Sequence, residues 1–253
     1  MDNVTILESF SLPSKGVIYG KPLKETFKMR SMTTNDEMKR LSHSEDAYRM
    51  LAEVMDDCML DSLGISCYDL HIGDFQYVLH RLRVVTYGSD YKVQSYCPSC
   101  AKLDNYTIDL DSFPVIEFDR EGWDKHTSFV LPRSKKQVEI RFQTPRMLDS
   151  VASRRREVQK KSKDSNGVDP SLALTVASLL KSVDGKVIDS IKAEQIARSL
   201  DMADTNCILQ HSMKLNGKVG IDTTIENVCS SCGVDYKVPF RVTSEFFGPS
   251  IDD

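Results

Sequence analysis

Four of the seven cysteines in this 253-residue chain form two C-x-x-C pairs, Cys97 with Cys100 and Cys229 with Cys232. A C-x-x-C turn presents two sulfur ligands from one tight bend, and zinc binds four thiolates at tetrahedral angles. In a single zinc ribbon the two pairs are separated by roughly 15–20 residues, whereas 128 residues separate these two. The spacing therefore predicts one structural zinc site only if the fold brings two distant turns face to face.

Two other uses of these cysteines remain open. Residues 97–100 (CPSC) also resemble a dithiol redox motif, but that chemistry favours a first cysteine at a helix N-terminus, where the thiol pKa falls. Residues 101–107 indicate a turn and a strand instead. The other alternative is free thiols, or a metal held only between chains. The odd number of cysteines does not indicate a disulfide framework and favours a reducing compartment.

Short strands are expected on both sides of each pair. The expected strands cover about 91–96, 105–110, 221–227 and 234–240. A helix with its N-cap at Asp74 and a terminal glycine at Gly88 precedes the first strand pair. Other helices are expected from a capping box at 34–37, over 46–60, after Thr144-Pro145, over 170–180, from Ser190 to 200, and over 202–215. A strand pair is expected within 127–142, a hairpin turn at 183–187, and Trp123 in a connecting stretch.

Three stretches of the first half return in the second half in the same order. FSLP at 10–13 returns as FVLP at 129–132, DFQYVL at 74–79 as DTNCIL at 204–209, and CPSC at 97–100 as CSSC at 229–232. This order predicts an α+β fold of two pseudo-symmetric repeats, each ending in a C-x-x-C turn between strands. The expected boundaries are 1–118 for the N-terminal repeat, 119–248 for the C-terminal repeat and 249–253 for a tail. Zinc would join the two repeats.

Positive charge is concentrated in one part of an acidic chain. The net charge is −4, yet residues 133–163 hold eleven Lys or Arg and three Asp or Glu. Such a stretch can steer acidic partners, although a solvated helix and loop is the more common reason for one. The residues expected to contact a partner are Arg154, Arg155, Arg156, Lys160 and Lys161.

The chain lacks the common signatures of catalysis. It has neither G-x-x-x-x-G-K-[ST] nor G-x-G-x-x-G, so no phosphate-binding loop is indicated. The five histidines are scattered, and His80 and His211 are expected on helix surfaces or half-buried rather than as ligands. A zinc ion with four thiolates has no open position for water. The sequence therefore predicts a protein that is not an enzyme and has no small-molecule substrate.

Several stretches together resemble the T4-type bacteriophage baseplate hub proteins and hub-assembly factors. They are FSLPSKGVIY at 10–19, MTTNDE at 32–37, IGD at 72–74, VTYGSDY at 85–91, CPSC at 97–100, VDGK at 183–186, CSSCG at 229–233 and EFFGP at 245–249. The last departs from the family pattern, which often has Trp where Gly248 stands. The resemblance spans nearly the whole chain. It implies a phage tail protein that contacts other baseplate and tail proteins.

The leading hypothesis is a non-enzymatic hub component or assembly factor with a structural zinc. The sequence has no apolar run of the ~20 residues that a membrane helix needs and no secretory signal. It is therefore expected in the host cytoplasm during assembly, and in the virion baseplate if it stays in the particle. The alternative is a nucleic-acid-binding zinc-ribbon regulator that uses the basic stretch on phosphates. Such binders usually place dense Lys, Arg and aromatic residues around the metal, which this chain does not.

Overall fold

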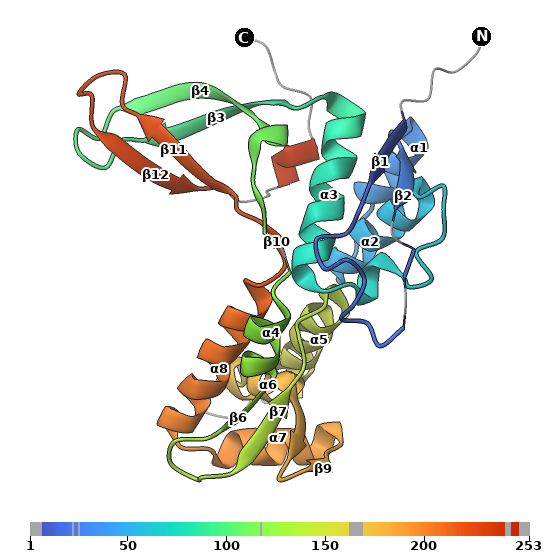
Figure 1. Cartoon of the computed structure of the whole chain (residues 1–253), viewed down its shortest axis with the longest axis vertical. Coiled ribbons are helices and arrows are strands. Elements are labelled where there is room, and N and C mark those ends of the chain that lie inside the picture. The colour runs from blue at the N-terminus through green and yellow to red at the C-terminus, as the bar shows by residue number, and fades with distance from the viewer. Residues whose placement is uncertain are drawn as a thin grey trace.

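The computed structural model describes residues 7–21, 23–24, 26–116, 118–161, 169–240 and 244–247. Its helices and strands form an upper and a lower group, and two β-hairpins project together from one side of the upper group (Figure 1). The fold is mixed α and β with small antiparallel sheets, as the sequence predicts. The predicted tail, 249–253, lies outside the described residues.

The upper group is built around one long helix. Its elements are β1 (Leu7–Phe10), β2 (Phe27–Arg30), α1 (Thr34–Arg40), α2 (Ala47–Cys58), the 3-10 turn Cys67–Asp69 and α3 (Ile72–Tyr87). β1 and β2 pair antiparallel. Phe27, Met55 and Phe75 are buried at the centre of the core that these elements share. Phe246 and Phe247, from the far end of the chain, are buried in the same core.

The lower group contains a four-stranded antiparallel sheet and five helices among the described residues. Its elements are α4 (Arg120–Thr127), β6 (Ser128–Val130), β7 (Gln137–Ile140), α5 (Pro145–Lys161), α6 (Ser171–Leu179), β8 (Leu180–Val183), β9 (Lys186–Val187), α7 (Ser190–Ser199) and α8 (Met202–Asn216). The sheet order is β6-β7-β8-β9. Asp184 and Gly185 both have positive φ, which confirms the predicted two-residue hairpin turn.

The two projecting hairpins carry the cysteine pairs. β3 (Asp90–Tyr96) pairs with β4 (Leu103–Asp109), and β11 (Thr224–Val228) pairs with β12 (Asp235–Pro239). A short ladder of β5 (Val115–Ile116) with β10 (Gly220–Ile221) lies between these hairpins and the lower group (Figure 1). The structure thus confirms the strands expected around both pairs, with ends that differ by at most three residues.

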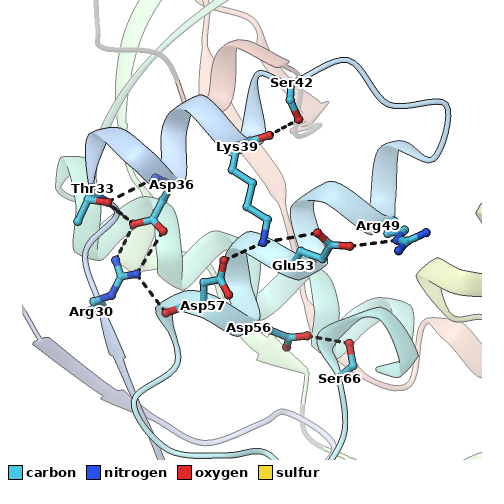
Figure 2. A network of polar contacts seen from close by, with 10 residues as sticks. All are labelled: Arg30, Thr33, Asp36, Lys39, Ser42, Arg49, Glu53, Asp56, Asp57 and Ser66. Carbon is cyan, nitrogen blue, oxygen red and sulfur yellow. Dashed lines mark hydrogen bonds and ion pairs between the residues drawn. The ribbon is translucent and has the colours of Figure 1, made fainter.

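The helix expected to start with a capping box at Thr34 uses the preceding threonine instead. The Thr33 hydroxyl accepts a hydrogen bond from the Asp36 amide at 3.4 Å, and Asp36 Oδ2 accepts one from the Thr33 amide at 2.7 Å. Arg30 also pairs with Asp36 at 2.6 Å (Figure 2), and this hydrogen bond lowers the pKa of Asp36 to about 2. Both threonines have an acidic residue three positions later, so the motif alone could not choose between them.

The expected N-cap at Asp74 is wrong. α3 begins two residues earlier, and its N-cap is His71, whose Nδ1 accepts a hydrogen bond from the Gly73 amide at 2.9 Å. Asp74 is fully buried, and it accepts hydrogen bonds from the Ser14 amide at 3.0 Å and from the hydroxyls of Ser14 and Tyr19. Burial raises the pKa of Asp74. An aspartate near a helix start is a common cap, so a partner sixty residues away was not visible in the sequence.

Two further sequence expectations need correction. The cap expected at Ser190 is Asp189, whose side chain accepts a hydrogen bond from the Lys192 amide at 2.7 Å. Trp123 does not lie in a connecting stretch but within α4, where it is buried against the second core. The N-cap at Thr144 is confirmed, because its hydroxyl accepts from the Met147 amide at 3.2 Å.

Helix α2 is capped by a residue of the other group. Asp46 precedes α2 but makes no capping hydrogen bond with its side chain. The buried carboxylate of Asp149, on α5, accepts hydrogen bonds from the Arg49 amide at 3.0 Å and the Tyr68 hydroxyl at 3.1 Å. We expect Asp149→Ala to lower the free energy of unfolding by about 1–2 kcal/mol, the usual cost of a lost cap. Urea unfolding measures this loss, and Asp46→Ala should lower the free energy of unfolding by less than ~0.5 kcal/mol. Equal losses in the two variants would contradict the assignment of Asp149 as the cap of α2.

His80 makes stability depend on pH in mild acid. It is buried on α3 beside Phe113 and Phe246, and neither ring nitrogen has a hydrogen-bond partner among the described residues. Burial lowers the pKa of His80 to about 4. The unfolded chain, whose histidine pKa is ~6.5, therefore binds the proton first as pH falls. Stability should decrease between these two pKa values by up to ~1.4 kcal/mol per pH unit from this residue.

His80→Phe should remove this contribution. Phenylalanine keeps the aromatic contacts and removes two unpaired buried nitrogens, so stability at pH 7 should be equal or higher. The free energy of unfolding should be measured with denaturant at pH values from 7 to 4. Its slope against pH should be smaller in the variant than in wild type by the contribution of about one proton. The exposed His43 provides the control, because His43→Gln should leave the slope unchanged. An unchanged slope in His80→Phe would show that this ring is protonated equally in both states.

Candidate metal centre

The first C-x-x-C turn closes the hairpin of β3 and β4. The Cys97 amide donates to the Lys102 carbonyl at 2.9 Å, and the Ala101 amide donates to the Cys97 carbonyl at 2.9 Å. Ala101 adopts a left-handed φ of 56°. This tight turn directs the sulfurs of Cys97 and Cys100 out of the end of the hairpin toward one place.

The second turn repeats this backbone geometry between β11 and β12. The Cys229 amide donates to the Val234 carbonyl at 3.0 Å, and the Gly233 amide donates to the Cys229 carbonyl at 2.9 Å. Gly233 has a φ of 72°, at the position that Ala101 holds in the first turn. Glycine adopts this conformation at little steric cost, which explains why one follows the second pair.

The fold brings all four sulfurs together. The Sγ atoms of Cys97, Cys100, Cys229 and Cys232 all lie within 4.8 Å of one another. The distance between Cys97 and Cys232 is 3.7 Å, and the distance between Cys100 and Cys229 is also 3.7 Å. Four thiolates at ~2.3 Å from a tetrahedral zinc lie ~3.8 Å apart, whereas a disulfide needs ~2.05 Å. The donor set and spacing therefore fit a zinc ion held by both hairpins.

The site is half covered. The first cysteine of each pair, Cys97 or Cys229, is buried, and the second, Cys100 or Cys232, is exposed. The amides of Cys232 and Ser231 direct N–H groups at the Cys229 sulfur, and they lower the pKa of Cys229 to about 7. This shift favours the thiolate form that binds metal at Cys229, whereas hydrogen bonding to Cys229 and the other two sulfurs raises the pKa of Cys232.

Polar contacts beside the cysteines hold one hairpin against the other. The Asp104 carboxylate, on β4, accepts from the Ser230 hydroxyl at 2.9 Å and from the Asn227 side-chain amide at 3.3 Å. These hydrogen bonds, that of Ser230 above all, lower the pKa of Asp104. The Tyr236 hydroxyl lies 3.0 Å from the Ser95 hydroxyl of β3. Sequence reasoning missed these residues. The available signal was that neighbouring residues of a strand point to opposite faces, so Asp104 lies on the face of β4 opposite to that of its exposed neighbours Leu103 and Asn105.

The arginines expected to contact a partner form ion pairs within the chain. Arg154 pairs with Glu157 at 3.1 Å. Arg155 pairs with Asp169 at 3.1 Å, and Arg156 reaches Asp46 at 3.5 Å. Lys160 is exposed, and the side chain of Lys161 lies outside the described residues. Partner contact through these five residues stays a prediction.

The geometry favours a structural site over a redox one. A zinc ion with four thiolates has no free position, so it would stabilise the fold and not activate water. Cys97 is followed by a turn and then β4, without the helix that lowers the thiol pKa in dithiol oxidoreductases. Within the described ranges, these cysteines are the only group of three or more His, Cys, Asp or Glu placed to share a metal ion.

Comparison with known proteins gave one match. A sequence-family model described as "T4 bacteriophage base plate protein" matches residues 8–248. The searches of curated proteins and of solved structures found no match. Among the residues that the structure describes, no helix has the length and apolar character needed to cross a membrane.

Proposed function

Because the chain belongs to the T4 bacteriophage base plate protein family, we propose that it is a baseplate hub component or a factor needed for hub assembly. The observation that carries this proposal is the family match, which covers residues 8–248. The protein would act by contact with other phage tail proteins and catalyse no reaction. It would work in the host cytoplasm while the tail is assembled, and in the virion baseplate if it stays in the particle.

Zinc is the ion that the four cysteines would hold. Soft thiolate ligands with tetrahedral spacing favour zinc over magnesium or calcium, which prefer oxygen ligands. The ion would join two hairpins that lie more than a hundred residues apart in the chain. Much of its binding energy would therefore be folding energy. A baseplate protein needs a fixed shape to fit its neighbours, and a zinc ion shared by the two hairpins would fix their relative position.

The two halves would derive from an internal duplication, with repeats over 1–118 and 119–248. Matching hydrogen bonds to two buried aspartates support this proposal. The Ser14 amide donates to Asp74 at 3.0 Å, and the Ser134 amide donates to Asp204 at 2.9 Å. Each aspartate is the third residue of a long helix, α3 or α8, that leads toward a cysteine hairpin. Each of the two cysteine turns also makes the same pair of backbone hydrogen bonds at equivalent positions.

The proposed role is tested in infected cells. A phage with a stop codon early in this gene should fail to complete baseplates, and the wild-type gene supplied in trans should restore them. Mass spectrometry of purified particles then separates the two forms of the proposal, because a hub component stays in the particle and an assembly factor does not. Normal baseplates without the protein would reject both forms.

The nucleic-acid alternative makes a different prediction. Binding through the basic stretch would show as retention on heparin or DNA that weakens steeply with salt. Replacing Arg154, Arg155 and Arg156 together with Glu would abolish it. A baseplate protein whose arginines are ion-paired within the chain should not be retained on heparin or DNA above physiological salt. The three substitutions should then leave its elution unchanged.

A further inference from the structure

Two histidines from different helices meet away from the cysteine cluster. His126 lies near the end of α4 and His211 lies within α8. Their Nδ1 atoms are 3.3 Å apart, and their ring centroids are 5.1 Å apart with an interplanar angle of 70°. Both side chains are half-buried, so one edge of the pair is open to solvent. Sequence reasoning assigned no shared role to them because 84 residues separate them in the chain.

The distances fit one metal ion held by both rings. Two imidazole nitrogens at ~2.0–2.1 Å from a tetrahedral zinc lie ~3.3 Å apart, with ring centroids ~5.2 Å apart. A straight N–H···N hydrogen bond of 3.3 Å would separate the centroids by more than 5.5 Å, roughly, because the rings would point directly at each other. The observed 5.1 Å is close to the value expected for two rings that share one ion, and a bent N–H···N hydrogen bond between the same two nitrogens is the alternative that the test must separate.

The surroundings hold one ring in place and keep both rings neutral. Phe129, on β6, stacks on His211 with centroids 3.7 Å apart and an interplanar angle of 17°. Burial lowers the pKa of both histidines, and nearby Lys214 lowers it further. Lys125 and Lys218 also lie near His126, and Lys218 is ion-paired with Asp119. Neutral imidazole is the form that binds metal, although the lysines reduce the affinity for a cation.

We propose that His126 and His211 form a second metal site, which binds one zinc-like divalent cation through the two Nδ1 atoms. Among the described residues, no third His, Cys, Asp or Glu joins these two histidines in a group placed to share a metal ion. Water would therefore complete the coordination, and the site would be weaker than the four-cysteine site. Open positions also allow a side chain of a partner protein to enter the coordination shell.

The test uses Zn²⁺ alone on the full chain already loaded with one equivalent of zinc. Isothermal titration calorimetry at pH 7.5 should show a second equivalent with micromolar affinity. His126→Gln and His211→Gln should each weaken it at least tenfold, whereas His43→Gln, on an exposed residue, should leave it unchanged. His211→Gln also removes the stacking contact with Phe129, so His126→Gln provides a second variant that leaves this contact in place. Thermal unfolding checks that both variants are folded.

Cobalt spectra separate this site from the cysteines. Co²⁺ bound by thiolates absorbs strongly in the near ultraviolet, whereas Co²⁺ bound by histidine and water does not. The second equivalent should add only weak visible bands, and the histidine variants should lose these bands while keeping the thiolate signal. The proposal is overturned if wild type shows no second equivalent, or if both histidine variants bind it as wild type does. Neither outcome bears on the baseplate role.

Discussion

Cys97→Ser and Cys229→Ser are expected to lower the free energy of unfolding by the same large amount, ~3 kcal/mol or more. Each removes one thiolate from a site that both hairpins share. Apparent zinc binding energies in small structural sites reach ~10–16 kcal/mol, so losing the ion costs much more than losing one side-chain contact. The double variant should cost little more than either single variant, because residues of one site are not additive.

The measurement combines elemental analysis, native mass and urea unfolding of the purified variants. Wild type should contain one zinc per monomer, and each cysteine variant should contain much less. Cys207→Ser is the matched control, because Cys207 is half-buried on α8 outside the cluster and should cost less than ~1 kcal/mol. Additive losses would indicate two separate sites. Half a zinc per monomer would place the site between two chains, and oxidised thiols without metal would favour the redox alternative.

Local signals predicted the elements that carry this site. The strands on both sides of each cysteine pair were predicted, and elsewhere in the chain Asp184-Gly185 predicted a hairpin turn. These signals depend on neighbours within a few residues of each other, so a single sequence contains them. The meeting of the two turns was predicted only through the repeated order of motifs. Chemistry then required two distant C-x-x-C pairs to share one ion.

Contacts between distant residues explain the wrong cap at Asp74 and two residues whose roles the sequence did not indicate. Asp74 and Asp149 are both near helix ends in sequence, yet each accepts hydrogen bonds from a segment at least sixty residues away. Asp104 faces the second hairpin through hydrogen bonds to Ser230, although its sequence context indicates an ordinary strand residue. A buried carboxylate needs several donors, and the sequence does not show which distant amides supply them. These roles therefore depend on the tertiary fold and not on the local sequence.

The backbone of α3 at Gly73 lies close to the backbone of Val219 and Gly220, and Gly73→Ala is the second substitution with a large expected effect. A Cβ atom at Gly73 would lie 2.0 Å from the Val219 carbonyl oxygen and 3.2 Å from the Gly220 Cα. Gly73 is in the first turn of α3, and Val219 and Gly220 lead from α8 toward the second cysteine hairpin. Neither neighbour is a flexible side chain, so the backbones must separate.

We expect Gly73→Ala to cost ~3 kcal/mol or more, in the range that marks steric overlap in a packed interior. Gly217→Ala is the matched control, because Gly217 has an ordinary φ of −77° and the nearest atom to its new Cβ is 3.4 Å away. That variant should change stability by less than ~0.5 kcal/mol. Urea unfolding of both variants measures the difference.

Zinc retention in Gly73→Ala tests how the packing is coupled to the metal site. Moving α3 away from β10 also moves the first hairpin, which follows α3, relative to the second hairpin, which follows β10. The four sulfurs would then no longer keep the 3.7 Å spacing that suits one ion. Competition with a chelator should therefore remove zinc faster from Gly73→Ala than from Gly217→Ala. Equal rates together with a large loss of stability would show that the hairpins hold the metal independently of the groups beneath them.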